Sequence, residues 1–312
     1  MLSDIFSCKS TLGITALVLS NFLFAQPPFD NAIQQSSSAQ ERAPISEFDV
    51  RPPNTWVSGE MGSMQVARAD CRAFPDEDIR QRIVDVAQQE WAFFGYPDYR
   101  FDEEIEDLPL EERRRRRARL SLDESVRVAD TIAGYWAATA EGGWIVDRQN
   151  DQWNGPDGHA ARWGDAWSAA FISWVMCEAG LADRSEFQHA IAHHGYIDQA
   201  IRARDGQDSN AVFVAYDSGE AEVLPGDLLC TGSRPLYLNL DQRRSQIGEG
   251  ARTHCDIVVK VDLDKGLIDT IGGNVQSTVT RKPIKITEDG RLLSPVDRDG
   301  RPVFAHLKLG LL

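Results

Sequence analysis

A serine, a histidine and an asparagine stand in this sequence where nucleophilic catalysis could use them. Ser168 opens an apolar segment of helical spacing, His254 begins an alternating segment, and Asn274 closes the next one. An imidazole can take the proton of a hydroxyl that attacks a carbonyl carbon, and a third polar side chain can hold the ring. The three residues therefore indicate acyl transfer, with Ser168 as nucleophile, His254 as base and Asn274 as the residue that orients the ring.

The segment that begins at Ser168 has the periodicity of a helix with one buried face. Ser168 heads an apolar stripe that continues with Phe171, Ile172, Val175 and Ala179. A hydroxyl at this place would face the layer packed on the helix, at the positive end of the helix dipole. The alternative is a helix cap, and Asp165 is an equally good candidate for capping.

His254 belongs to a segment in which apolar and polar residues alternate as in a strand. His254 and Asp256 share one face, whereas Cys255 and Ile257 share the other. Asp256 is therefore a rival to Asn274 for the second nitrogen of the imidazole.

Helical patterns come first along the chain and strand patterns follow. Helical spacing covers residues 76–95, 123–142 and 185–206 besides the segment at Ser168, and β-rich runs dominate from residue 211 onward. This order predicts an α+β fold with helices packed on a small antiparallel sheet.

Composition and charge limit the partners that the protein can have. The chain has 312 residues and a formal charge of −15, from 33 basic and 48 acidic side chains. Such a charge opposes binding to nucleic acid or to an anionic membrane. Residues 1–25 have the pattern of a secretory signal peptide, and residues 26–70 that of a flexible linker, so we expect a periplasmic or secreted protein with no transmembrane segment in the mature chain.

Four short motifs, in this order, resemble those of the papain-like cell-wall hydrolases. They are WSAAFISWVMCEAG, LPGDLLC, HCDIVV and IGGNVQSTV, and the resemblance covers about residues 160 to 312. The sequence is similar to the NlpC-type and CHAP amidase group, and most closely to an uncharacterised bacterial branch of that clan. The resemblance implies a nucleophile at Ser168, a base at His254 and an orienting residue at Asn274, which we therefore favour over Asp256.

The sequence departs from the clan at the nucleophile, which is usually a cysteine. A serine hydroxyl is too weakly acidic to ionise, so His254 would have to deprotonate Ser168 during attack. The resemblance and the signal peptide together predict a monomeric peptidoglycan amidase or endopeptidase that needs no cofactor. The alternatives are an inactive periplasmic binding or scaffold module on the same fold, and an exported toxin that degrades cell walls.

Several further residues are candidates for supporting roles. Asp165 and Asp227 could support the site, while Trp163 and Trp167 could line a substrate groove. His189, His193 and His194 lack a metal-binding pattern, so we predict no metal site. The arginines Arg113–Arg117 follow a run of acidic residues and favour a solvated, locally paired helix face over an interaction patch. We expect a helical extension over residues 71–158 and a hydrolase domain over residues 159–312.

Signal cleavage would leave four cysteines, Cys71, Cys177, Cys230 and Cys255. Four cysteines allow three pairings, and free buried thiols are an equal alternative. If the strand ending at Cys230 pairs with the strand containing Cys255, these two form one disulfide, and Cys71 with Cys177 forms the other.

Overall fold

The structure is a computed structural model that describes residues 39–67, 70–74, 78–99, 120–293 and 301–310. All of them lie in one unit, residues 31–312. The signal peptide predicted for residues 1–25 and the run Arg113–Arg117 lie outside these ranges. Among the described helices, none has the length and apolar character needed to cross a membrane.

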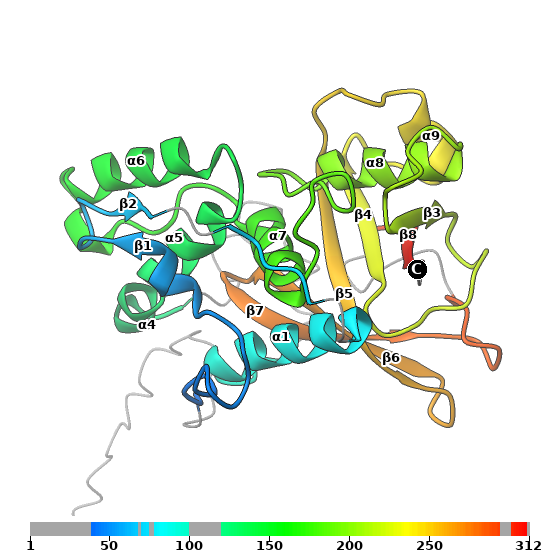
Figure 1. The fold of residues 1–312 in the computed structure, drawn as a ribbon, viewed down its shortest axis with the longest axis horizontal. Coiled ribbons are helices and arrows are strands. Elements are labelled where there is room, and N and C mark those ends of the chain that lie inside the picture. The colour runs from blue at the N-terminus through cyan, green and yellow to red at the C-terminus, as the bar shows by residue number, and fades with distance from the viewer. Residues whose placement is uncertain (1–38, 68–69, 75–77, 100–119, 294–300, 311–312) are drawn as a thin grey trace, which may run out of the picture. The chain divides into compact units, whose positions relative to one another are not determined.

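The alternating segments of the C-terminal half form a six-stranded antiparallel sheet in the order β3-β8-β4-β5-β6-β7 (Figure 1). The long hairpin β5-β6 and the hairpin β6-β7 place His254 and Asp256 beside Gly272 and Lys282. The strands are β3 (Phe213–Tyr216), β4 (Leu228–Arg234), β5 (Arg252–Asp262), β6 (Leu267–Val275), β7 (Thr278–Lys285) and β8 (Val303–Leu309).

Helices from both halves of the chain pack around the central helix α7 (Ser168–Ala179). Helix α7 contacts β5 and β6 of the sheet, as well as α1 (Ile79–Phe93) and α5 (Ala129–Ala137). The remaining helices are α4 (Leu122–Arg127), α6 (Gly142–Trp153), α8 (His194–Arg204) and α9 (Leu240–Arg244), with the 3-10 turns η1 (Pro53–Trp56) and η2 (Gly158–Ala160). Every residue of α7 is buried, because the helix has packed layers on all sides.

The α+β class with an antiparallel sheet is confirmed, but the expected division into segments is wrong in two respects. Residues 39–67 are not a flexible linker: they form η1 and the small hairpin of β1 (Val57–Ser58) and β2 (Gln65–Val66), and they bury Trp56 in the core. Tyr135 and Trp174 lie in that same core, so it crosses the expected boundary at residue 158. The helical segment is therefore part of the same unit as the sheet.

Local patterns also misled the helix prediction for residues 185–206. The helix begins only at His194. Before it, the backbone N–H of Gln188 donates to the side chain of Gln199 on α8, and that of Ala190 donates to Ser173 on α7. These tertiary hydrogen bonds replace the helical ones in the first half of the segment.

Both expected disulfides are confirmed. Cys230 and Cys255 are direct partners in the β4-β5 ladder and are bonded to each other. Cys71 is bonded to Cys177 on α7, which fixes the N-terminal segment to that helix.

Candidate active site

Helix α7 begins at Ser168, which does not act as its cap. The residue at the cap position is Trp167, and no side chain caps the helix, so neither Ser168 nor Asp165 has the capping role considered above. The first N–H groups of a helix have no partner within the helix and carry partial positive charge. The N–H groups beside Ser168 are thus placed to stabilise negative charge.

The Ser168 hydroxyl contacts the imidazole of His254. Its Oγ lies 2.8 Å from Nδ1 of His254, and Nε2 of the same ring lies 2.9 Å from Oδ1 of Asp256. Because a carboxylate only accepts, Nε2 carries the ring proton and Nδ1 is left to accept from the Ser168 hydroxyl. The three side chains form one directional chain of hydrogen bonds from nucleophile to carboxylate.

Asp256 is held from its other side by the ammonium group of Lys282. The Nζ atom of Lys282 contacts Oδ2 of Asp256, and the two side chains are only 4% and 5% exposed. Burial would raise the pKa of Asp256, but the charges of Lys282 and His254 outweigh burial and hold that pKa well below its ordinary value. Asp256 is therefore an anion at neutral pH.

Two glycines of β6 make room for this arrangement. A Cβ atom on Gly272 would lie 1.9 Å from Oδ1 of Asp256 and 3.1 Å from Nε2 of His254. A Cβ atom on Gly273 would lie 2.6 Å from Cβ of Phe171 on α7. The pair of glycines thus lets β6 approach the carboxylate and the helix closely, which is a common reason for glycine within a strand.

Contrary to the expectation from the sequence, Asn274 does not hold the imidazole. Nε2 of His254 is bonded to Asp256, and Asn274 lies two residues beyond Gly272, where the register between β6 and β7 shifts. Its backbone is left-handed with φ 56°, and Gln276 and Ser277 in the following turn also have positive φ. Left-handed backbone at non-glycine residues is costly and is concentrated at functional sites. Asn274 instead lines the cavity described next.

A cavity of about 650 Å³ opens over Ser168 and His254. Asp165 also lines it, where it forms an ion pair with Arg148 and not with the imidazole. Trp163 and Trp167 line a smaller neighbouring cavity, and Trp167 is 2% exposed because it stacks against Phe94 and Tyr135. The larger cavity is therefore not filled by tryptophan, and the groove role expected for these two residues is not seen there.

Asp227 has a structural role away from the imidazole. It is fully buried and bonds to His306 and Arg80, and to the backbone N–H groups of Leu224 and Leu309. These bonds fasten the start of β4 to β8 and α1. The support to His254 expected from Asp227 comes from Lys282 through Asp256, a pair that sequence reasoning missed.

A second histidine, His193, borders the site. Its ring centroid lies 5.3 Å from that of His254, and its Nδ1 contacts the hydroxyl of Tyr196. Burial and the neighbouring His254 lower the pKa of His193 well below its ordinary value, so the ring stays neutral.

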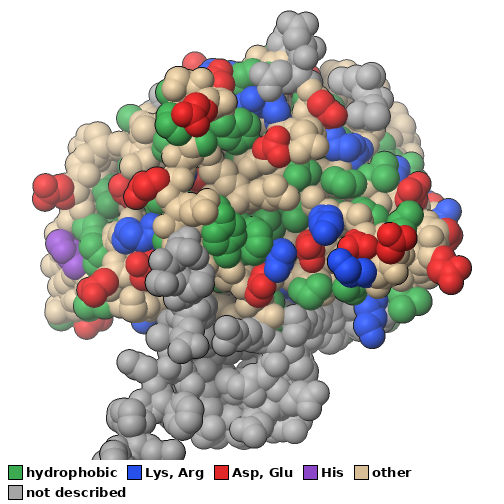
Figure 2. Space-filling view, turned by 90° about the horizontal axis from the view of Figure 1, so that it is seen from below, with side chains coloured by type: hydrophobic (Ala, Val, Ile, Leu, Met, Phe, Trp, Pro, Cys, Tyr) green, Lys and Arg blue, Asp and Glu red, His purple; other side chains and the backbone are tan. Residues whose placement is uncertain are grey.

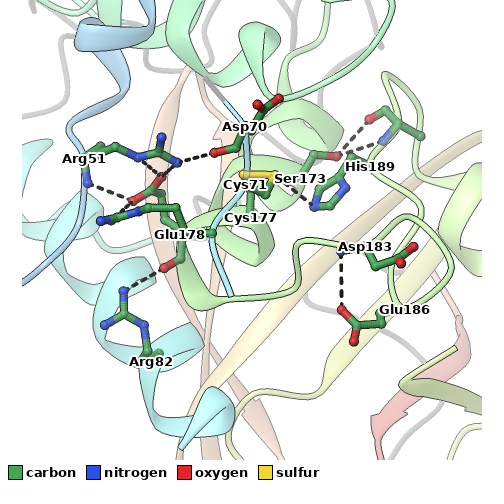
Figure 3. Close-up of a disulfide and its surroundings, with 12 residues drawn as sticks. Arg51, Asp70, Cys71, Arg82, Ser173, Cys177, Glu178, Asp183, Glu186 and His189 are labelled. Carbon is green, nitrogen blue, oxygen red and sulfur yellow. Dashed lines mark hydrogen bonds and ion pairs between the residues drawn. A yellow bond between two sulfur atoms is a disulfide. The ribbon is translucent and has the colours of Figure 1, made fainter. Parts of the chain in front are cut away.

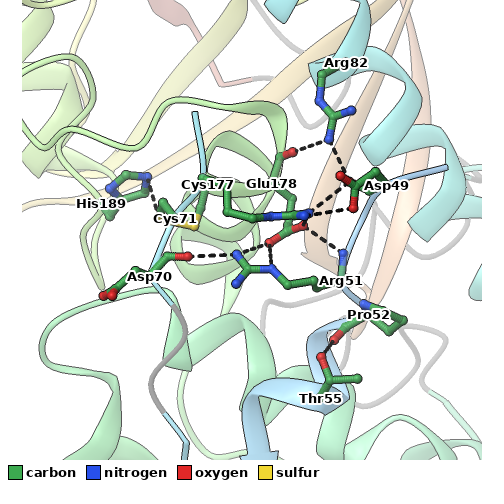
Figure 4. A network of polar contacts seen from close by, with 11 residues as sticks. Asp49, Arg51, Pro52, Thr55, Asp70, Cys71, Arg82, Cys177, Glu178 and His189 are labelled. Atoms are coloured by element: carbon green, nitrogen blue, oxygen red, sulfur yellow. Dashed lines mark hydrogen bonds and ion pairs between the residues drawn. A yellow bond between two sulfur atoms is a disulfide. The ribbon is translucent and has the colours of Figure 1, made fainter. Parts of the chain in front are cut away.

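The N-terminal segment is fastened to the end of α7 by ion pairs and a disulfide. Arg51 contacts Glu178 through its backbone N–H and its guanidinium, and Arg82 donates to the backbone carbonyl of Glu178 (Figure 4). Cys71 and Cys177 form the disulfide beside them, with Nε2 of His189 3.9 Å from Sγ of Cys71 (Figure 3). Cys71, Cys177 and His189 are close enough to hold a metal ion, but the disulfide joins both sulfur atoms.

Fold and site together define an α+β protein in which a helix N-terminus presents a serine to a histidine, an aspartate and a buried lysine on an antiparallel sheet. Residues 123–308 match the family described as "Uncharacterized protein conserved in bacteria (DUF2272)", and the protein belongs to this family. The match runs from α4 to β8 and so includes both sides of the boundary expected at residue 158. No curated protein and no solved structure matches the chain.

Proposed function

We propose that the protein is an exported hydrolase that cleaves amide or ester bonds through an acyl-enzyme on Ser168. The observation that carries this proposal is the hydrogen-bonded chain from Ser168 through both nitrogens of His254 to Asp256, at the wall of a cavity of about 650 Å³. Ser168 does not cap the helix, and its hydroxyl contacts His254 instead.

In the attack step, the Oγ atom of Ser168 bonds to the carbonyl carbon while its proton passes to Nδ1 of His254. The ring then carries a positive charge, which the anionic Asp256 stabilises through Nε2. In the serine protease template the hydroxyl contacts Nε2 and the carboxylate contacts Nδ1, so the two ring nitrogens have exchanged roles here. The chemistry is unchanged, because either nitrogen of imidazole can accept the proton.

The tetrahedral intermediate places a negative charge on the former carbonyl oxygen. N–H groups at the start of α7, including that of Ser168, are available to stabilise it. Collapse of the intermediate transfers the proton from Nδ1 to the departing amine or alcohol. A water molecule, deprotonated by His254, then hydrolyses the acyl-enzyme and regenerates the Ser168 hydroxyl.

The substrate that we propose is a peptide-like polymer outside the cytoplasm, in the first place peptidoglycan. Support comes from the signal-peptide pattern of residues 1–25, from the two disulfides, which persist in oxidising compartments, and from the resemblance of the ordered motifs to papain-like cell-wall hydrolases. A helix that carries the nucleophile and packs on an antiparallel sheet that carries the base is consistent with a papain-like arrangement.

A binding module without catalysis is the alternative, because a serine stands where the clan usually has cysteine. The contact between Ser168 and His254 and the open cavity above them favour hydrolysis.

The test is digestion of purified peptidoglycan sacculi, with mass spectrometry of the released fragments. The wild type should release a defined product and Ser168→Ala should release none. Ser245→Ala, which changes the exposed serine that follows α9, should match the wild type. If only Ser168→Cys releases fragments, the groove binds this polymer but the native serine acts on another substrate. If neither the wild type nor Ser168→Cys releases fragments, peptidoglycan is not the substrate.

A further inference from the structure

An arginine lines the cavity on the strand that also carries His254. Arg252 is the first residue of β5, two positions before His254, and both line the cavity. Arg234, the last residue of β4, is the direct partner of Arg252 in the ladder. Like charges directly opposite on neighbouring strands destabilise a sheet. An anion bound between the two guanidinium groups would relieve this repulsion.

No described side chain supplies that anion. Within the residues that the structure describes, neither Arg234 nor Arg252 forms an ion pair or a side-chain hydrogen bond through its guanidinium, and both are exposed. Two other charged side chains of the cavity are already paired, Asp165 with Arg148 and Lys282 with Asp256. Arg252 thus faces the cavity with its hydrogen-bonding capacity unused.

Most of the charged residues that line the cavity are basic, whereas the chain as a whole is acidic. The chain carries −15, and on the face drawn in Figure 2 acidic and basic side chains lie interspersed. Among the described residues that line the cavity, by contrast, Asp165 is the only acidic one, against the basic Arg252, Lys282 and Arg301. Because Lys282 and Asp165 are paired and Arg301 has an interaction within the protein, Arg252 is the cavity arginine that an anionic ligand can meet.

We infer that Arg252, at the wall of the cavity, binds a carboxylate of the substrate, with Arg234 as its neighbour on β4. The inference rests on the proposed function, since it describes the molecule that Ser168 would cleave. Two residues of a strand span about 7 Å, and an extended peptide advances about 3.5 Å per residue. The carboxylate therefore belongs to a group within about two residues of the bond that Ser168 attacks. Guanidinium matches carboxylate geometry with two parallel hydrogen bonds, which gives selectivity as well as affinity.

The kinetic test uses a matched pair of activated esters, the 4-nitrophenyl half ester of adipic acid and the methyl ester of that same compound. The first carries a carboxylate and the second is neutral. We expect the wild type to have a higher kcat/KM for the anionic ester than for the neutral one. Arg252→Gln should reduce this preference about tenfold by raising KM for the anionic ester, and should leave hydrolysis of the neutral ester unchanged. Arg234→Gln should reduce the preference to a smaller extent. Arg202→Gln on α8, outside the cavity, is the control and should keep it.

A binding measurement separates failure of this inference from failure of the proposed function. NMR titration of Ser168→Ala with adipate should shift the Nε–H resonance of Arg252, and adipamide should not. If the wild type hydrolyses both esters equally and adipate leaves Arg252 unshifted, the carboxylate site is refuted although the hydrolase stands. If neither ester is cleaved but adipate binds at Arg252, the hydrolase fails and the anion site stands. Tighter binding of inorganic phosphate than of adipate would overturn the carboxylate in favour of a phosphate group.

Discussion

Replacing Lys282 with methionine removes the ammonium group that faces the buried carboxylate of Asp256 and keeps most of the side-chain volume. Because both side chains are at most 5% exposed, the change leaves a buried charge with one partner fewer. Breaking a buried ion pair from one side costs 3–5 kcal/mol in proteins. His254 still bonds Asp256, so we expect the low end, a loss of about 3 kcal/mol in the free energy of unfolding.

The pH dependence of this loss has a definite sign. In the wild type the pKa of Asp256 is lowered from 3.8, so its contribution to stability is present above pH 3.8 and is lost as the pH falls through the folded-state pKa. In Lys282→Met, burial should raise the pKa of Asp256. A carboxyl whose pKa is raised in the folded state lowers the free energy of unfolding as the pH rises above 3.8. The difference between wild type and variant should therefore grow from pH 4 to pH 7.

The assay is equilibrium unfolding in urea at pH 4 and pH 7, with a double-variant cycle. Lys282→Met combined with Asp256→Leu should be less destabilised than the sum of the two single variants, with a coupling of about 2 kcal/mol or more. Lys285→Met, an exposed lysine of the same strand, should change stability by less than about 0.5 kcal/mol. A cost below about 1 kcal/mol for Lys282→Met, or additivity in the cycle, would refute the reasoning.

Three further predictions concern the close approach of β6, a buried histidine and the two disulfides. Gly272→Ala places a Cβ atom 1.9 Å from Oδ1 of Asp256, so hydrolysis should fall at least tenfold while circular dichroism stays native; full activity would contradict the close approach. Burial lowers the pKa of His189 from 6.5 to about 4. When the pH falls from 7 to 5, the free energy of unfolding in urea should therefore decrease by about 2 kcal/mol more in the wild type than in His189→Gln. Equal decreases would show that His189 is not buried as described. Replacing Cys71 and Cys177 with serine should lower the free energy of unfolding by about 5 kcal/mol, and replacing Cys230 and Cys255 by about 3.5 kcal/mol, because the first disulfide closes a loop of 106 residues and the second a loop of 25. Equal losses in thermal unfolding would argue against loop entropy as the cause.

Periodicity was sufficient to predict the fold class and the elements that position the site. The apolar stripe after Ser168 and the alternation after His254 each correspond to an observed element, α7 and β5. The N-terminal residues 39–67 could not be placed in this way. Their burial depends on single contacts such as that of Trp56 with the core, and such contacts leave no periodic signal.

The site was predictable where it follows strand alternation and not where it depends on tertiary contacts. Alternation put His254 and Asp256 on one face, and the glycine at 272 was a sign of close approach that could have favoured Asp256 over Asn274. Lys282 lies on β7, and only the register of β5, β6 and β7 brings it to Asp256. A lysine in an alternating strand usually faces solvent, so its sequence position held no signal of a buried ion pair.

The central claim is that Ser168 is a nucleophile activated by His254, and covalent labelling tests it most directly. The protein is treated with a fluorophosphonate ester, which phosphonylates activated serines, and the modified residue is located by peptide mass spectrometry. We predict a single adduct at Ser168, which forms in the wild type and forms at least a hundredfold more slowly in His254→Ala. The absence of an adduct at Ser168, or labelling at the same rate without His254, would contradict it.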